Sequence, residues 1–359
     1  LDLVLLTGKS KLPKVKSAKP KLYIGTHAVI NKIDEIKPGL IIYDEQHRFG
    51  VSQRSTNQQS KNKKSTNQKL NKGKIKSAHI LTMSATPIPR SLMLTIFSHL
   101  KVSYIDELPQ GRKQTKTWVI PENKREAGYE WIAQELSKTD QSIQKKMCLI
   151  VCPFIDPSNH LAFENVASTK EVYEKINEYF TSKQTNKKLS IGLLHGRIKN
   201  DEQAKIINEI YQNKIDILVT TPIIEVGVDL PTASIILIES ADRFGMASLH
   251  QLRGRVGRSG QQGYCLLFSE SKSATTKKRL QEFSKENNGL KLAELDLKNR
   301  GSGDIFGTTQ SGFSQLKFAT WTNLDLIAKA QKKYQELPKD WQSFFDIKSD
   351  TKDPKPLAN

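Results

Sequence analysis

The chain has 359 residues, of which 37% are hydrophobic and 26% are charged, and this suits two globular domains with an appended segment. Its 56 lysine and arginine residues outnumber 37 acidic residues, which gives a formal net charge of +19. This excess favours a polyanionic partner, nucleic acid first and an acidic membrane second. A lysine-rich protein that stays soluble through its charge is the alternative.

The apolar runs are too short to span a bilayer, and the sequence has no signal peptide, so we expect no membrane partner and a cytoplasmic location. The chain begins with Leu1, inside what reads as a strand, and we expect it to start within a domain. Cys148, Cys152 and Cys265 form no metal-binding spacing, which predicts reduced thiols in the core of a cytosolic protein.

Four short apolar runs come first along the chain, and each predicts a β-strand: residues 1–6, 21–26, 40–45 and 79–86. Their apolar residues are continuous rather than alternating, so we expect these strands to be buried on both faces.

A second set of apolar runs follows at residues 147–153, 189–196, 215–221, 233–239 and 263–268. Residues 171–183 and 201–214 have the apolar spacing of helices and lie between these strands. Alternating strands and helices predict an α/β fold with parallel sheets, and two sets of strands predict two lobes.

Residues 107–118, with Pro109 and Gly111, are predicted to link the two lobes. Residues 52–76 are almost entirely polar and predict a flexible surface loop, whose lysines are either solvated or in contact with nucleic acid. After residue 275 the pattern is helical and polar, and residues 348–359 are predicted to be disordered. The expected domains are therefore residues 1–112, 113–275 and 276–359.

The first candidate site is IIYDEQHRFG at residues 41–50, where an apolar strand ends in two acids. Side chains at the carboxyl end of a buried parallel strand face the ligand crevice of an α/β sheet. We predict that Asp44 binds Mg²⁺ and that Glu45 polarises an attacking water. A surface turn with chance acids is the alternative.

The next strand ends in TMSATPIPR, residues 82–90. Ser84 and Thr86 have hydroxyls that can bond to the acids and report their state to the other lobe. A simple turn at the end of the strand is the alternative.

TTPIIEVGVDLP, residues 220–231, brings hydroxyls to the end of a strand of the second set. Thr220 and Thr221 suit the phosphates of a nucleic acid, together with backbone N–H groups. Gly227 and Asp229 follow, and we expect them to contribute to a nucleotide site.

HQLRGRVGRSG, residues 250–260, places Arg253, Arg255 and Arg258 among glycines that let the backbone approach a phosphate. A planar guanidinium facing a transferring phosphoryl group acts as an arginine finger. An isolated arginine–glycine stretch is more often a generic patch that binds anions or RNA. Here the stretch follows the other three segments in order, and this order argues against a generic patch.

These four segments, DEQH, SAT, TTPIIEVGVD and QLRGRVGR, resemble in order the motifs of superfamily 2 helicases and translocases. The longer stretches DEQHRFGVSQR, VCPFIDPS, ESADRFGMASLHQLRGRVGRSG and RGSGDIFGTTQSG resemble the RecG family of bacterial DNA helicases. The resemblance covers nearly the whole chain. It implies two RecA-like parallel-sheet lobes, the first one incomplete, and a helical C-terminal extension.

The resemblance also implies roles for individual residues. Asp44 and Glu45 would serve Mg²⁺ and water activation, while Gln46 and His47 would couple the nucleotide site to the second lobe. Gln251, Arg255 and Arg258 would meet the phosphates of ATP. The DNA track would be lined by Thr26, His27, His195, Gly196, Arg197, Thr220 and Thr221.

A C-terminal element of the family links closure of the lobes to movement on duplex DNA, and Arg300, Gly301, Gly303 and Gln310 match it. Thr309 stands where the family usually has arginine, and Ser302 stands where it often has proline. The resemblance further implies a bacterial monomer that uses ATP and Mg²⁺ on branched duplex DNA, such as forks and Holliday junctions.

An ATP motor needs a phosphate-binding loop, G-x-x-x-x-G-K-[ST], before a helix. The sequence contains Gly8-Lys9-Ser10, but Leu3 occupies the position of the upstream glycine, and Pro13 and Pro20 argue against a following helix. We therefore interpret this segment as a decoy. We expect the chain to hold half of an ATP–Mg²⁺ site, to lack the family's junction-binding wedge, and to be inactive alone.

Three alternatives remain open. The transcription-repair coupling factor shares the arginine segment, although its acid motif usually reads DEEQRFGV. A catalytically inactive DNA-binding module fits the charge and the missing loop. An RNA helicase of the DEAD/DEAH type is disfavoured by the C-terminal element that begins with the RGSG sequence at residues 300–303.

Overall fold

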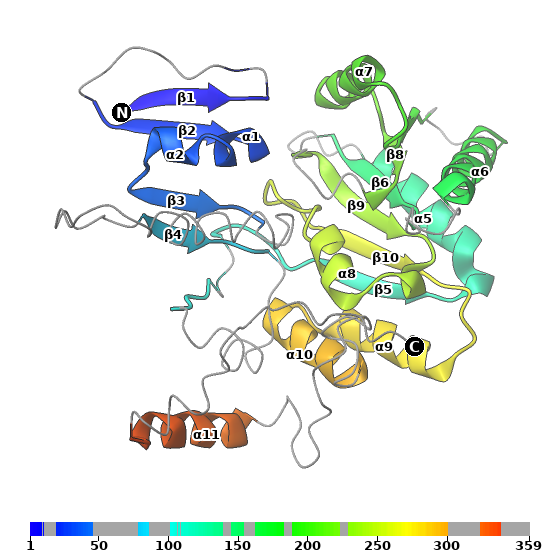
Figure 1. Cartoon of the computed structure of the whole chain (residues 1–359). Coiled ribbons are helices and arrows are strands. Elements are labelled where there is room, and N and C mark those ends of the chain that lie inside the picture. Colours follow the sequence, from blue (N-terminus) through cyan, green and yellow to red (C-terminus); the bar gives the residue numbers. More distant parts are fainter. Residues whose placement is uncertain are drawn as a thin grey trace, which may run out of the picture. The chain divides into compact units, whose positions relative to one another are not determined.

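The computed structural model describes residues 1–8, 10, 19–45, 78–85, 101–105, 107, 109–138, 145–153, 162–182, 189–222, 229–300 and 324–338. The polar segment 52–76 and the tail 348–359 lie outside these residues. The chain divides into two compact units, Leu1–Ala85 and Thr86–Asn359. Most of their helices and strands are labelled in Figure 1.

The first unit contains two pairs of parallel strands. β1 (Asp2–Leu6) pairs with β2 (Lys21–Gly25), and β3 (Leu40–Tyr43) pairs with β4 (His79–Thr82). The one-turn helices α1 (His27–Ile30) and α2 (Ile33–Ile36) lie between β2 and β3 in the chain. All four strands were predicted from their apolar runs, and these predictions are confirmed.

The prediction that these four strands are buried on both faces is wrong for this structure. Leu3 and Leu5 are each 70% exposed, and all four residues of β4 are exposed. Within the described residues, α1 and α2 are each only four residues long, so they cover little of the strands. Leu6, in contrast, is fully buried.

The second unit is built on a six-stranded parallel sheet with the strand order β5-β10-β9-β6-β8-β7. The strands are β5 (Lys116–Ile120), β6 (Met147–Val151), β7 (Ile191–Leu194), β8 (Ile217–Thr220), β9 (Ala233–Ile238) and β10 (Tyr264–Phe268). Every residue of β6, β8 and β9 is buried, as continuous apolar runs predict for central parallel strands. The predicted α/β fold with a parallel sheet is confirmed here.

β5 was not predicted, because its sequence KTWVI begins inside the segment interpreted as a linker. The linker prediction for residues 107–118 is therefore wrong at its C-terminal end. β5 pairs with β10 in the register Lys116↔Tyr264 and forms one edge of the sheet. An edge strand tolerates lysine and threonine, so it lacks the apolar continuity of the central strands.

The helices of the second unit are α5 (Arg125–Ser137), α6 (Ala162–Ser182), α7 (Asn200–Tyr211), α8 (Met246–Arg253), α9 (Ala274–Lys285), α10 (Gly289–Arg300) and α11 (Leu324–Glu336). The predicted helices at 171–183 and 201–214 fall within α6 and α7 to within three residues. The helical pattern after residue 275 is confirmed by α9, α10 and α11. None of the helices among the described residues is both long and apolar enough to cross a membrane.

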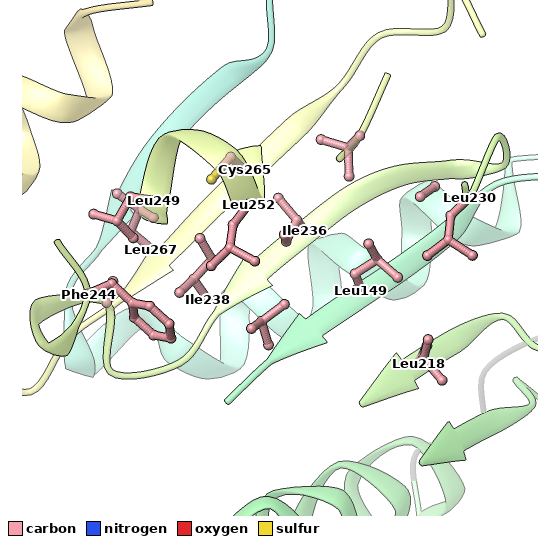
Figure 2. Close-up of a cluster of buried hydrophobic side chains, with 14 of the residues drawn as sticks. Leu149, Leu218, Leu230, Ile236, Ile238, Phe244, Leu249, Leu252, Cys265 and Leu267 are labelled. Atoms are coloured by element: carbon pink, nitrogen blue, oxygen red, sulfur yellow. The ribbon is translucent and has the colours of Figure 1, made fainter. Parts of the chain in front are cut away.

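Two hydrophobic clusters are formed by alternate residues of the same strands. Met147, Leu149 and Val151 of β6 belong to the first cluster, and Cys148 and Ile150 belong to the second. Figure 2 shows part of the first cluster, to which α8 contributes Leu249 and Leu252. Leu280 and Phe283 of α9 and Leu292 of α10 also belong to it, so both helices pack on this core.

Cys148, Cys152 and Cys265 are buried free thiols, as predicted. Burial raises the pKa of Cys265 to about 12 and raises the pKa values of the other two thiols as well. These thiols therefore stay protonated and unreactive near neutral pH.

Candidate functional site

The carboxyl ends of all six strands of the second unit lie at one edge of the sheet, because all the strands are parallel. This is the edge at which doubly wound sheets bind ligands. His195 directly follows β7, Thr220 and Thr221 close β8, and Glu239 directly follows β9. The sheet thus brings the predicted residues after β7 and β8 to one edge, together with a carboxylate that was not predicted.

The polar groups after β7 and β8 are held close to the backbone. The Nδ1 atom of His195 accepts a hydrogen bond from the backbone N–H of Arg197 at 3.3 Å. Burial, then Lys170 and Arg197, lowers the pKa of His195, so its ring is neutral near pH 7. Arg197 itself is exposed, and so is Gly196.

The two threonines at the end of β8 are buried. The Thr220 hydroxyl donates to the carbonyl of Thr221 at 3.1 Å. Of this predicted set, the exposed Arg197 is the side chain most open to a phosphate, with the basic Lys170 close to the same histidine.

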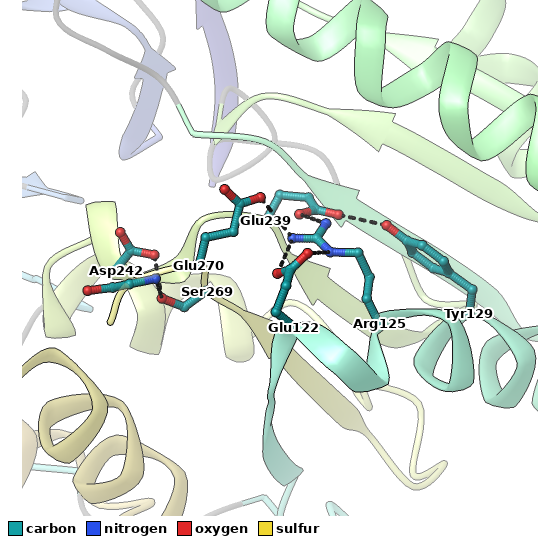
Figure 3. Close-up of polar contacts among 8 residues, drawn as sticks. Glu122, Arg125, Tyr129, Glu239, Asp242, Ser269 and Glu270 are labelled. Atoms are coloured by element: carbon teal, nitrogen blue, oxygen red, sulfur yellow. Dashed lines mark hydrogen bonds and ion pairs between the residues drawn. The ribbon is translucent and has the colours of Figure 1, made fainter. Parts of the chain in front are cut away.

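An ion-pair network at Glu239 was missed by the sequence reasoning (Figure 3). The Arg125 guanidinium of α5 donates to the Glu239 carboxylate at 2.7 Å, and the Tyr129 hydroxyl donates to the same carboxylate at 3.0 Å. Arg125 also bonds to Glu122 at 3.2 Å and to Glu270 at 3.4 Å. Burial is the largest single influence and lowers the pKa of Arg125, but the charges of Glu239 and Tyr129 and the hydrogen bonds to both residues together raise the pKa overall.

The loop between β9 and α8 is fixed by further polar contacts. The Ser269 hydroxyl donates to the Asp242 carboxylate at 2.6 Å, as Figure 3 shows. Arg279 of α9 donates to the carbonyls of Asp242 at 2.7 Å and Phe244 at 2.8 Å. The loop that leads into α8 is therefore anchored to the sheet and to α9, and the arginine segment begins in the last turn of this helix.

The structure separates the three arginines of this segment. Arg253 is 3% exposed, and its guanidinium donates to the carbonyls of Glu286 at 2.9 Å and Phe283 at 3.2 Å. The interpretation of Arg253 as an arginine facing a phosphate is therefore wrong, because α9 and the loop after it enclose this side chain.

Arg255 and Arg258 remain candidates for phosphate contact. Arg255 and Gln251 are both partly exposed. Arg258 forms an ion pair with Asp229 at 2.9 Å, so the structure brings together two of the predicted nucleotide-site residues. Gly227, predicted beside Asp229, lies outside the described residues.

Gly257 occupies the turn between these two arginines with φ of 70°. A Cβ atom there would meet the backbone of Gly263 at 3.1 Å. Glycine therefore satisfies both the backbone conformation and the packing of this turn.

In the first unit, the predicted acids come directly after β3. The backbone N–H of Met83 donates to the carbonyl of Tyr43 at 2.8 Å, so Asp44 and Ser84 follow the paired strands at the same edge. Asp44 and Ser84 are exposed, and Glu45 adopts left-handed backbone with φ of 52°. A residue other than glycine in this conformation is uncommon and is often found at functional sites.

Gln46, His47 and Thr86 lie outside the described residues. Among the described residues, no group of three or more histidine, cysteine or acidic side chains could hold a metal. Mg²⁺ needs only one or two protein carboxylates when phosphates and waters supply its other ligands. The adjacent carboxylates of Asp44 and Glu45 therefore fit a magnesium site that also requires a nucleotide.

Thr26 and His27 follow β2 at the carboxyl end of that strand. Thr26 is exposed and makes no side-chain cap to α1. A Cβ atom on the preceding Gly25 would lie 2.2 Å from the carbonyl oxygen of Leu6. The backbones of β1 and β2 therefore approach closely where the predicted DNA track begins.

The predicted coupling element begins at the end of α10, whose last residue is Arg300. Gly301, Ser302, Gly303, Thr309 and Gln310 lie outside the described residues. The predicted role of this element therefore remains a prediction.

Residues 129–260 match the helicase conserved C-terminal domain family. The chain is 40% identical over 341 residues to the ATP-dependent DNA helicase RecG of Thermotoga maritima, covering 93% of this chain and 40% of that protein. It is 38% identical over 312 residues to RecG of Bacillus subtilis, covering 87% of this chain and 42% of that protein. The chain thus spans about two fifths of the length of these curated relatives.

A solved structure of RecG bound to a three-way DNA junction is similar to the chain, with a TM-score of 0.62 and 34% identity. The match covers 91% of this chain and 40% of the RecG chain in that structure. Mss116p bound to single-stranded RNA and AMP-PNP has a TM-score of 0.50 at 18% identity, covering 79% of this chain and 56% of that one, a likeness of fold alone.

Proposed function

We propose that this chain belongs to the RecG family and is the motor part of an ATP-dependent DNA helicase that remodels branched DNA by fork reversal and Holliday junction migration. The observation that carries the proposal is 40% identity to a RecG helicase over 93% of the chain. The net charge of +19 supports a nucleic-acid partner independently. The proposal includes a monomer in the bacterial cytoplasm that acts in recombination and repair.

In this proposal, the end of α8 and the segment after it supply the phosphate-binding residues of the second unit. Gln251, Arg255 and Arg258 bind the phosphates of the nucleotide, and Asp229 contributes to the same site. We also assign Gly227, Gln46 and His47 to nucleotide binding. The partial exposure of Arg255 and the exposure of Arg258 support this role, because both side chains are accessible in the segment that follows α8.

Asp44 holds Mg²⁺, and Glu45 accepts a proton from the attacking water. The bound Mg²⁺ would neutralise phosphate charge during hydrolysis. The position of both carboxylates at the end of β3, beside Ser84, supports this assignment.

Movement on DNA uses contacts to the phosphate backbone, which makes stepping independent of sequence. We assign these contacts to Arg197 and the residues around it, with Thr26 and His27 in the first unit. Ser84, Thr86, Arg300, Gly303 and Gln310 couple hydrolysis to movement.

The test is ATP turnover with and without forked DNA, by this chain alone and by this chain joined to the preceding part of the B. subtilis relative. We expect no turnover by the chain alone, because its sequence has no complete phosphate-binding loop. The joined protein is expected to hydrolyse ATP when DNA is added, and Glu45→Gln is expected to abolish hydrolysis while nucleotide binding is kept.

DNA-stimulated turnover by the chain alone would show that the loop was misread at residues 8–10. Salt-sensitive DNA binding without any turnover by the joined protein would support the inactive DNA-binding module instead. Retained hydrolysis in the Glu45→Gln variant would remove Glu45 from the role of base.

A further inference from the structure

A tight turn precedes β5 and places an arginine that no predicted motif contains. The backbone N–H of Arg112 donates to the carbonyl of Pro109 at 3.0 Å. Gly111, at the third position of this turn, has φ of 81°, a conformation that favours glycine. The turn therefore fixes the direction in which the chain presents Arg112.

The guanidinium of Arg112 reaches the arginine segment. Its Nη2 atom donates to the carbonyl oxygen of Gly254 at 3.0 Å. The Nε–H of Arg258 donates to the same oxygen at 3.3 Å. Gly254 caps the C-terminus of α8, where unsatisfied carbonyls and the helix dipole favour cations. Two guanidinium groups therefore converge on one carbonyl.

The charges at this point are unbalanced. Among the described residues, Arg258 pairs with one carboxylate, that of Asp229, whose side chain is 68% exposed. Within the described part of the chain, no carboxylate pairs with Arg112. Burial, and then the positive charge of Arg258, lowers the pKa of Arg112, as expected for neighbouring cations.

His250 adds no positive charge to this cluster near neutral pH. Burial, and then the charges of Arg253 and Arg112, lowers its pKa to about 4. Two guanidinium groups and one carboxylate leave an excess of positive charge that an anion would neutralise.

We propose that Arg112 and Arg258 form a paired guanidinium site for the polyphosphate of a nucleoside triphosphate, and that Asp229 holds Arg258 when phosphate is absent. The proposal rests on the proposed function, which makes a nucleoside triphosphate the ligand. A guanidinium matches the geometry of a phosphate with two parallel N–H groups. Because both guanidinium groups already share an acceptor, their side chains need little reorganisation to share a phosphate.

The role of Asp229 follows from its exposure. A carboxylate that is largely in water forms a weak ion pair, so a phosphate with more charge can displace it. Asp229 would then lower the affinity for the polyphosphate, since its ion pair with Arg258 must break before the phosphate binds.

The test is isothermal titration calorimetry at constant ionic strength. Inorganic tripolyphosphate is titrated into the 359-residue chain, and the dissociation constant is measured. We expect Arg112→Gln and Arg258→Gln each to weaken binding about tenfold, and Asp229→Asn to tighten it several-fold. Lys113→Gln is the matched control, because it removes the same charge from the adjacent exposed residue and is expected to leave affinity unchanged.

Arg112→Lys distinguishes the effect of the planar guanidinium from the effect of its charge, and it is the more conservative substitution for folding. It keeps the positive charge but loses the planar fork, and we expect its affinity to lie between those of the unmodified chain and Arg112→Gln. The unfolding midpoint of each variant is measured alongside, and intact folding with weakened binding supports the site.

Weaker binding in Arg258→Gln with full affinity in Arg112→Gln would overturn the role of Arg112 and leave the proposed function standing. Equal losses in Arg112→Gln and Lys113→Gln would reduce the effect to general charge and also overturn the site. Absence of tripolyphosphate binding by the unmodified chain would overturn it too. DNA-stimulated hydrolysis by the joined protein would even then support the proposed function.

Discussion

The Arg253 guanidinium lies over the ring of Phe283, with 4.3 Å between its central carbon and the ring centroid. Phe283 is a fully buried residue of α9, and Arg253 ends α8. The same guanidinium donates to the backbone carbonyls of Phe283 and Glu286. A residue of the arginine segment therefore joins the helical extension to the sheet.

Replacement of Arg253 by alanine should destabilise the second unit by about 3 kcal/mol, because one buried and one partly buried carbonyl lose their donor and a ring loses its partner. Urea unfolding followed by tryptophan fluorescence measures this change. Arg258→Ala is the matched control and should cost under about 1 kcal/mol, since its ion pair with Asp229 is largely solvated. Equal losses in the two variants would contradict the assignment of separate roles.

The Arg125–Glu239 pair should show strong energetic coupling. The side chain of Glu239 is only 6% exposed, so removal of Arg125 leaves a buried carboxylate with less compensation. Arg125→Met and Glu239→Gln should each cost about 3 kcal/mol, with a coupling energy of about 2 kcal/mol in a double-mutant cycle.

The exposed pair Lys333–Glu336 is the control for this cycle, and its coupling should stay under about 0.5 kcal/mol. Comparable coupling in both pairs would mean that burial does not strengthen the Arg125–Glu239 pair.

Gly25 should not tolerate a side chain. A Cβ atom there would lie 2.2 Å from the Leu6 carbonyl oxygen, so Gly25→Ala should destabilise the pairing of β1 with β2 by about 2 kcal/mol. Hydrogen exchange of the amides in these strands reports the change directly. Gly39→Ala is the control, because a Cβ atom at Gly39 meets nothing within 4 Å. Unchanged protection in Gly25→Ala would show that the two strands separate readily.

His250 should make stability depend on pH in the acidic range. Its folded pKa of about 4 lies below the ordinary value of 6.5, so the unfolded chain binds a proton first as pH falls. Stability is therefore fully present above about pH 6.5 and is lost as pH falls towards 4, by up to about 3 kcal/mol from this group.

Urea unfolding at intervals between pH 7 and 4 checks this dependence. His250→Gln should flatten the slope in that range, although His195, whose pKa is also lowered, will keep part of it. An unchanged slope in His250→Gln would mean that the ring is already solvated in the folded protein.

The central strands could be predicted from the sequence because parallel strands buried on two faces need continuous apolar residues. The strand at Lys116–Ile120 escaped prediction because an edge strand is covered less and carries lysine and threonine. The exposure of Leu3 and Leu5 could not be predicted either, since an apolar run does not reveal how much covers it.

The candidate site was predictable in its residue types but not in their division of roles. Arg253 and Arg258 stand in similar glycine-containing sequence, and only the packing of α9 separates the buried arginine from the accessible one. The bond between Arg112 and Gly254 joins residues 142 positions apart, and no local pattern predicts such a contact.

The strand order has a consequence for synthesis of the protein. β5 is the first strand of its sheet in the chain, yet its pairing partner is β10, the last. Nascent β5 must therefore wait on the ribosome until some 150 further residues have been translated, at about 5–20 residues per second. Its aromatic Trp118 stacks on Tyr264 and cannot do so earlier. The sheet is thus completed only when its final strand has been synthesised. A chain interrupted before residue 264 would leave β5 unpaired and prone to aggregation.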